Sequence, residues 1–155
     1  MAQLQKATFG MGCFWQPDLI YSKVKGIKSV EVGYMGGKIK NPSYMLVCTG
    51  MTGHAEVVHI KFEPKKVSYN KLLDIFWKRH DPTQLNKQGQ DIGSQYRTVI
   101  FYHSTEQKKK ALASLEKMQK ELNGKVMTEI KKALTFYKAE KYHQKYLEKH
   151  GQKTC

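Results

Sequence analysis

The sequence Gly12-Cys13-Phe14-Trp15 lies between a strand-like run, residues 6–11, and a helix-compatible run, residues 17–25. Proline is tolerated in the first turn of a helix, so Pro17 predicts that a helix begins there. Cys13 is then expected at a strand-to-helix turn, where free N–H groups and the macrodipole favour a thiolate. The stretch indicates a nucleophilic cysteine followed by two aromatic side chains. A cysteine packed in the core is the ordinary alternative.

Length and composition indicate one globular domain. The chain has 155 residues, of which 40% are hydrophobic, enough for a substantial core. No apolar run approaches the roughly 18 residues of a membrane span. The polar start, residues 1–6, does not resemble a signal peptide. We therefore expect a cytoplasmic protein with no membrane partner and a single domain, 1–155, in which 150–155 form a flexible tail.

The net charge of +14 raises the possibility of a nucleic-acid partner. The lysines are interleaved with Glu116, Glu121, Glu129, Glu140 and Glu148, however, and no nucleic-acid motif is present. We interpret the lysines as a solvated surface and expect no nucleic-acid partner. The alternative, a basic ferredoxin-like module that binds RNA, would need an aromatic strand motif that this chain lacks.

The three cysteines, at positions 13, 48 and 155, form no Cys-x-x-Cys pair. Neither zinc spacing nor a secreted disulfide scaffold fits this pattern. His54 and His59 are a weak metal signal without cysteine support, so we expect no metal and no cofactor. Scattered cysteines in a cytosolic chain point to redox or nucleophilic chemistry, or to no function at all.

Hydrophobic periodicity predicts the elements of an α+β fold. Strands are expected at residues 6–11, 29–34, 56–62 and 98–103, with 133–137 either a fifth strand or irregular. Helices are expected at 17–25, 68–77, 105–123 and 140–150. The helix at 68–77 should bury one apolar face, comprising Leu72, Leu73, Phe76 and Trp77, and the helix at 105–123 should bury another, comprising Leu112, Leu115, Met118 and Leu122. The β-α-β-β-α-β order predicts a ferredoxin-like two-layer sandwich with an additional C-terminal helical segment and tail.

Two long polar loops, residues 35–53 and 80–96, carry candidate functional side chains. Glu56 opens a strand directly after the first loop, a position suited to a catalytic acid or base. Tyr44 and Tyr96 lie one in each loop and could donate hydrogen bonds to a single oxygen, although loop tyrosines usually pack locally. Asp91 is a turn-forming residue that could brace the second loop.

Seven motifs, spread over nearly the whole chain, resemble peptide-methionine (S)-S-oxide reductase, the A class of methionine sulfoxide reductases. They are Gly12-Cys13-Phe14-Trp15, Val32-Gly33-Tyr34-Met35-Gly36-Gly37, Asn41-Pro42-Ser43-Tyr44, Thr52-Gly53-His54-Ala55-Glu56, His80-Asp81-Pro82-Thr83-Gln84, Gln90-Asp91-Ile92-Gly93-Ser94-Gln95-Tyr96-Arg97 and Tyr142-His143-Gln144-Lys145-Tyr146-Leu147. One departure is Gln16-Pro17-Asp18, where the family usually has Gly, a small apolar residue and Glu.

The resemblance implies a role for each candidate residue. Cys13 is the nucleophile, Glu56 the proton donor, Tyr44 and Tyr96 donors to the sulfoxide oxygen, Asp91 a member of the same site, and Phe14 and Trp15 the wall for the substrate methyl group. A sulfoxide oxygen leaves poorly until it is protonated, so the acid must be neutral. A free Glu has a pKa of about 4.3, and apolar surroundings would raise it.

The resemblance also implies how the enzyme is recycled. Attack on methionine-S-sulfoxide, free or in proteins, would leave a sulfenic acid on Cys13. Cys155 would then close a disulfide with Cys13, and a thioredoxin-like dithiol would reduce it. We favour Cys155 over Cys48 as the resolving thiol and expect a monomer. The alternative enzyme, a thiol peroxidase, would use Cys13 on hydrogen peroxide without needing Glu56.

Overall fold

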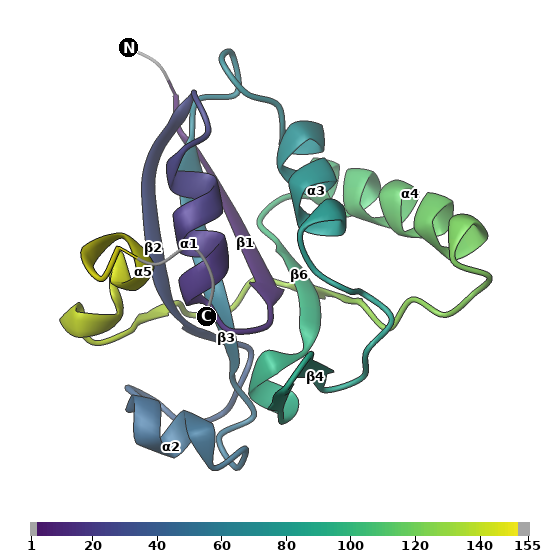
Figure 1. Ribbon diagram of the computed structural model, residues 1–155. Coiled ribbons are helices and arrows are strands. Elements are labelled where there is room, and N and C mark those ends of the chain that lie inside the picture. Colours follow the sequence, from purple (N-terminus) through teal and green to yellow (C-terminus); the bar gives the residue numbers. More distant parts are fainter. Residues whose placement is uncertain (1–2, 152–155) are drawn as a thin grey trace.

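The computed structural model describes residues 3–151, and the elements follow the order drawn in Figure 1. The strands are β1 Gln5–Met11, β2 Ile27–Met35, β3 Ala55–Phe62, β4 Lys87–Gln88, β5 Asp91–Ile92, β6 Thr98–Tyr102, β7 Glu129–Lys132 and β8 Tyr137–Lys138. The helices are α1 Trp15–Ser22, α2 Tyr44–Cys48, α3 Tyr69–Lys78, α4 Thr105–Glu121 and α5 Tyr146–Lys149, with 3₁₀ turns η1 Ser94–Tyr96 and η2 Lys141–His143. The predicted tail extends beyond residue 151, and Cys155 lies outside the described residues.

Six strands form the main sheet, in the order β7-β6-β1-β3-β2-β8. The four central strands, β6, β1, β3 and β2, pair antiparallel with one another, and β7 runs parallel to β6. The order β1-α1-β2-β3-α3-β6 is the predicted β-α-β-β-α-β order, and the α+β class is confirmed. The sheet is wider than the four strands of a ferredoxin-like fold because β7 and β8 extend its two edges.

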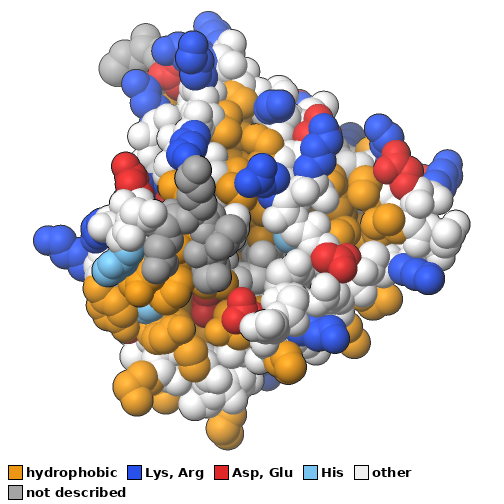
Figure 2. Space-filling view, in the orientation of Figure 1, with side chains coloured by type: hydrophobic (Ala, Val, Ile, Leu, Met, Phe, Trp, Pro, Cys, Tyr) orange, Lys and Arg blue, Asp and Glu red, His pale blue; other side chains and the backbone are white. Residues whose placement is uncertain are grey.

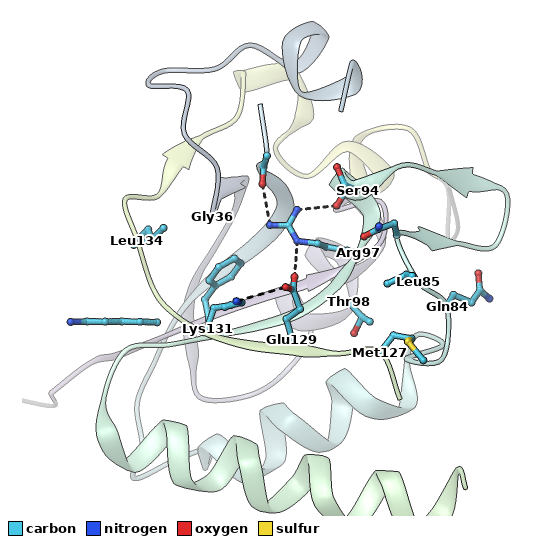
Figure 3. Close-up of a pocket in the computed structure, with 14 residues that line it drawn as sticks. Gly36, Gln84, Leu85, Ser94, Arg97, Thr98, Met127, Glu129, Lys131 and Leu134 are labelled. Atoms are coloured by element: carbon cyan, nitrogen blue, oxygen red, sulfur yellow. Dashed lines mark hydrogen bonds and ion pairs between the residues drawn. The ribbon is translucent and has the colours of Figure 1, made fainter. Parts of the chain in front are cut away.

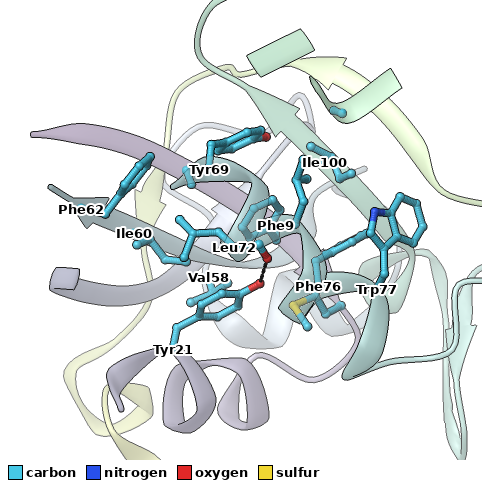
Figure 4. Packing of buried hydrophobic residues seen from close by; sticks show 14 of the residues in the cluster. Phe9, Tyr21, Val58, Ile60, Phe62, Tyr69, Leu72, Phe76, Trp77 and Ile100 are labelled. Carbon is cyan, nitrogen blue, oxygen red and sulfur yellow. Dashed lines mark hydrogen bonds between the residues drawn. The ribbon is translucent and has the colours of Figure 1, made fainter. Parts of the chain in front are cut away.

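The main core lies between one face of this sheet and the helices α1, α3 and α4 (Figure 4). The Phe9 ring lies at its centre, 5.8 Å from the Tyr21 ring and 5.3 Å from the Phe76 ring. The predicted apolar face of α3 is buried as expected. In α4 the prediction for Leu112 is wrong: that side chain is exposed and Ala111 is buried in its place.

The opposite face of the sheet is also covered, by the chain that follows β7. Met35, Val57 and Phe101 are buried there under Ala133 and Phe136. Of the two alternatives for 133–137, the irregular one is confirmed for 133–136, because β7 ends at Lys132 and β8 begins at Tyr137. The residues between them pack through their side chains instead of joining the ladder.

Both long loops contain short elements that the sequence did not reveal. Ser43 caps α2 by accepting a hydrogen bond from the Leu46 N–H at 3.2 Å. The second loop contains the β4–β5 hairpin and η1. Five residues are too few for a helical period to be recognised in a sequence. Figure 1 shows α2, β4 and α5 arranged around the end of the sheet where β1 stops.

The predicted helix 140–150 is interrupted at its centre. The Gln144 side-chain oxygen accepts the Val32 N–H at 2.9 Å, and its amide donates to the Val32 carbonyl at 2.9 Å. Lys145 follows with a left-handed φ of 56°. A residue in this conformation cannot continue a right-handed helix, so only η2 and the single turn α5 form. Within residues 3–151, no helix combines the length and apolarity needed to cross a membrane.

Candidate active site

Cys13 lies where β1 gives way to α1. Gly12 precedes it with φ 90°, and a Cβ at that glycine would lie 2.7 Å from the Gln88 side chain, so no other residue fits. Cys13 itself is partly exposed. The helix begins at Trp15, two residues earlier than predicted. Pro17 is therefore its third residue, still within the first turn, where an N–H has no intrahelical acceptor.

Glu56 lies on the neighbouring strand β3 with its side chain inside the protein, only 1% exposed. Its Oε1 accepts a hydrogen bond from the Phe14 N–H at 3.2 Å. The carboxyl therefore contacts the residue that follows Cys13. Burial of this kind disfavours the charged form of a carboxyl.

Tyr44 and Tyr96 contribute their hydroxyl groups from the two loops. Burial raises the pKa of both phenols. A hydrogen bond with the Cys48 thiol raises that of Tyr44 further, and electrostatic interaction with the nearby Glu56 carboxyl does the same for Tyr96. Both hydroxyls therefore stay protonated and can donate hydrogen bonds. Cys13, Asp91 and Glu56 all interact electrostatically with Tyr96, so the structure brings these sequence-predicted polar residues close to its hydroxyl.

An aromatic wall adjoins these groups. The Phe14 ring is buried, 5.8 Å from the Tyr34 ring. The Trp15 indole stacks on Tyr146 with 3.8 Å between centroids and 8° between planes. Its Nε1–H donates to Nδ1 of His143 at 3.0 Å. His143 and Tyr146 are residues to which the sequence assigned no role, although the motif at 142–147 that contains them was recognised.

Glu140 was also missed, and it fixes the start of α2. Its Oε1 accepts from the Tyr34 hydroxyl and its Oε2 from the Tyr44 N–H, each at 3.0 Å. Burial alone would raise the pKa of Glu140, but these hydrogen bonds lower it overall. An ionised Glu140 therefore anchors the loop that carries Tyr44.

Cys48 lies at the end of α2, one helical turn after Tyr44. The residue is exposed, yet partial burial of its thiol raises the pKa, and the nearby carboxyl groups of Glu56 and Glu140 add to that shift. The hydrogen bond from Tyr44 acts in the opposite direction. Cys48 thus lies near the site, but its raised pKa favours the thiol over the nucleophilic thiolate.

A surface pocket of about 610 Å³ is lined by none of the predicted site residues (Figure 3). The Arg97 guanidinium at its wall donates to the Ser94 and Gly53 carbonyls, each at 3.0 Å, and pairs with Glu129 at 2.9 Å. Ser94 opens η1, which ends at Tyr96, and Gly53 precedes β3. We take this pocket as a support for the two loops and not as the reaction site.

The remaining surface and the histidines give no sign of a second chemistry. On the face in Figure 2, Lys and Arg are scattered between acidic residues, while hydrophobic side chains gather towards the lower left. His54 accepts the Gly37 N–H at 3.0 Å and contacts the Ile39 carbonyl at 2.7 Å. Among residues 3–151, no group of three or more His, Cys, Asp or Glu side chains could hold a metal ion.

Comparisons with known proteins agree with this geometry. A family model described as peptide methionine sulfoxide reductase matches residues 5–155. Peptide methionine sulfoxide reductase MsrA of Methanothermobacter thermautotrophicus is 52% identical over 157 residues, covering 100% of this chain and 93% of that protein.

Solved structures show the same fold. Reduced Mxr1 from Saccharomyces cerevisiae has a TM-score of 0.93 and 36% identity, covering 99% of this chain and 89% of that one. Mxr1 in complex with Trx2 has a TM-score of 0.67 and 25% identity, covering 93% and 85%. With a family model that spans almost its whole length and a relative half identical to it throughout, the chain belongs to the peptide methionine sulfoxide reductases of class A, which are oxidoreductases.

Proposed function

We propose that this protein reduces methionine-S-sulfoxide, free or within proteins, to methionine, with Cys13 as the nucleophile. The observation that carries the proposal is the 3.2 Å hydrogen bond from the Phe14 N–H to Glu56, which ties a buried carboxyl to the residue after Cys13. A nucleophile and an acid held this close can act on one sulfoxide from two sides.

In the reaction, the Cys13 thiolate attacks the sulfoxide sulfur while Glu56 supplies a proton to the oxygen. Tyr44 and Tyr96 donate hydrogen bonds to that oxygen, and Asp91 supports the loop that carries Tyr96. Phe14 and Trp15 enclose the substrate methyl group. The sulfoxide is reduced by two electrons to the sulfide, and Cys13 is oxidised by two electrons to a sulfenic acid.

A second thiol completes the cycle. Cys155 attacks the sulfenic sulfur, forming a Cys13–Cys155 disulfide and releasing water. A thioredoxin-like dithiol then exchanges with this disulfide and becomes oxidised itself. The complex of the related Mxr1 with Trx2 supports such a partner. A cytoplasmic location, where thiol reductants are kept reduced, fits this cycle. One chain supplies every residue named, so a monomer suffices.

The test is to incubate the protein with each epimer of methionine sulfoxide and dithiothreitol, with methionine formation as the readout. We expect turnover of the S epimer alone. Equal turnover of both epimers would contradict the assigned stereochemistry. Dithiothreitol-dependent loss of hydrogen peroxide, with neither epimer consumed, would instead favour the thiol peroxidase.

A further inference from the structure

Asp18 is a buried carboxylate that the chemistry proposed above does not use. It lies on α1, one turn after Trp15, and is only 1% exposed. Burying an ionised carboxylate is unfavourable unless it is paired and hydrogen-bonded. The partners of Asp18 therefore show which part of the fold depends on its charge.

Both oxygens of Asp18 bind Lys145, which is distant in sequence. The Lys145 backbone N–H donates to Oδ2 at 2.7 Å, and Nζ donates to Oδ1 at 2.8 Å. Nζ also donates to the Val30 carbonyl at 2.8 Å. Lys145 has a left-handed φ of 56°, which a residue with a side chain keeps only where its surroundings impose it. The carboxylate thus fixes both the backbone and the side chain of Lys145.

The residues on either side of Lys145 are those that hold the Trp15 indole. His143 accepts the indole N–H at 3.0 Å, and Tyr146 stacks on the ring at 3.8 Å. Since these contacts come from residues two before and one after Lys145, they depend on where Lys145 is anchored.

We propose that Asp18 is a positioning residue whose ion pair with Lys145 fixes residues 143–146 and thereby the plane of Trp15. This inference rests on the proposed function, in which Trp15 lines the wall for the substrate methyl group. The pair acts on substrate binding, because the groups that it orders form the wall and do not supply the proton. It also gives a role to one residue of Gln16-Pro17-Asp18, where this chain departs from its family.

The test uses Asp18→Asn and Lys145→Gln, each in a Trp77→Phe background that leaves Trp15 as the single tryptophan. Loss of an interaction made equally in the ground and transition states raises KM, so we expect KM for N-acetyl-methionine-S-sulfoxide to rise about tenfold while kcat changes less than about twofold. Quenching of Trp15 fluorescence by acrylamide should increase in both variants. In the double variant, KM and the quenching of Trp15 should be no higher than in either single variant, because the two residues act as one unit.

Two further variants separate positioning from general stability. Asp18→Glu keeps the charge and should largely restore KM and the Trp15 signal. Glu63 is also a buried carboxylate, with ion pairs to Lys28 at 3.4 Å and Lys66 at 3.1 Å. It lies seven residues along from Glu56, about 23 Å for an extended strand. Glu63→Gln should lower thermal stability and leave KM and Trp15 unchanged.

The proposal is overturned if Lys145→Gln, at a side chain that is about one-third exposed, leaves both KM and Trp15 quenching as in the parent. It is equally overturned if Glu63→Gln raises KM to the same extent. Failure of the proposed function looks different: the parent protein would turn over neither epimer, while the quenching of Trp15 would still respond to Asp18→Asn and Lys145→Gln.

Discussion

The backbone amide of Phe14 and the carboxyl of Glu56 are joined by a hydrogen bond of 3.2 Å. The two residues are 42 positions apart in the chain, yet the β1–β3 pairing brings them together. The turn after β1 and the start of β3 therefore form one unit, which is the basis of the first prediction.

Replacing Glu56 with Gln should preserve the shape of the site and remove its proton. The Gln side-chain oxygen can still accept the Phe14 N–H, so the turn should remain in place. Because a general acid typically contributes roughly 10²–10⁴-fold, kcat for the S epimer should fall by that factor. Steady-state kinetics with dithiothreitol measures it, with Glu63→Gln as the matched control. A near-normal kcat would exclude Glu56 as the acid.

Replacing either Tyr44 or Tyr96 with Phe should reduce kcat less than replacing Glu56 with Gln does. A hydrogen bond contributes about 1 kcal/mol, so each single change should reduce kcat about tenfold or less. Either hydroxyl partly substitutes for the other. The fold reduction in kcat of the double variant should therefore exceed the product of the two single reductions. Tyr102→Phe, at the far end of β6, serves as the control. If one single change abolishes activity, the two tyrosines do not share the oxygen.

Replacing Cys155 with Ser should separate chemistry from recycling. A single turnover of methionine release should survive, because it needs only Cys13. The variant should then stop as a sulfenic acid, which a dimedone adduct detects by mass spectrometry. Recycling by thioredoxin should fail, although dithiothreitol can attack Cys13 directly.

Cys48→Ser is the matched variant for that experiment, because Cys48 lies beside Tyr44 and its thiol pKa is raised. It should recycle with thioredoxin as the parent does. Normal recycling of Cys155→Ser together with failure of Cys48→Ser would assign the resolving role to Cys48.

Acid should destabilise the fold through His80. Its Nδ1 contacts the Phe76 carbonyl and its Nε2 contacts the Thr98 hydroxyl at 2.7 Å, and burial lowers its pKa from 6.5 to about 4. The unfolded chain takes up this proton near pH 6.5 and the folded protein does not. The contribution of neutral His80 to the free energy of unfolding is therefore present above pH 6.5 and is lost as the pH falls from 6.5 through about 4.

Urea unfolding at several pH values measures this effect. For such a shift, the free energy of unfolding should fall by roughly 2 kcal/mol between pH 7 and pH 5 through this residue alone. His80→Gln should reduce the slope of the free energy of unfolding against pH. The control His150→Gln, at an exposed position, should leave that slope unchanged. An unchanged slope in His80→Gln would show that His80 is not the group responsible.

The sequence by itself determined the features that depend on local pattern. Alternation identified the four central strands, and the apolar spacing of α3 identified the helix that buries Leu72 and Phe76. The position of Cys13 at a strand-to-helix turn followed from the strand-like run before it and from Pro17 after it. These predictions succeeded because each depends on residues only a few positions apart, so that the spacing of apolar residues can be read directly from the sequence.

Only the tertiary structure decided how the C-terminal segment meets the site. Glu140 reaches Tyr44 across 96 positions, and Lys145 reaches Asp18 across 127. Buried charges and hydrogen bonds between such distant residues leave no periodic trace in a sequence, and here they overrode the helix expected at 140–150. The physical reason is that an unpaired buried carboxylate is so unfavourable that its partner segment gives up regular helix to satisfy it.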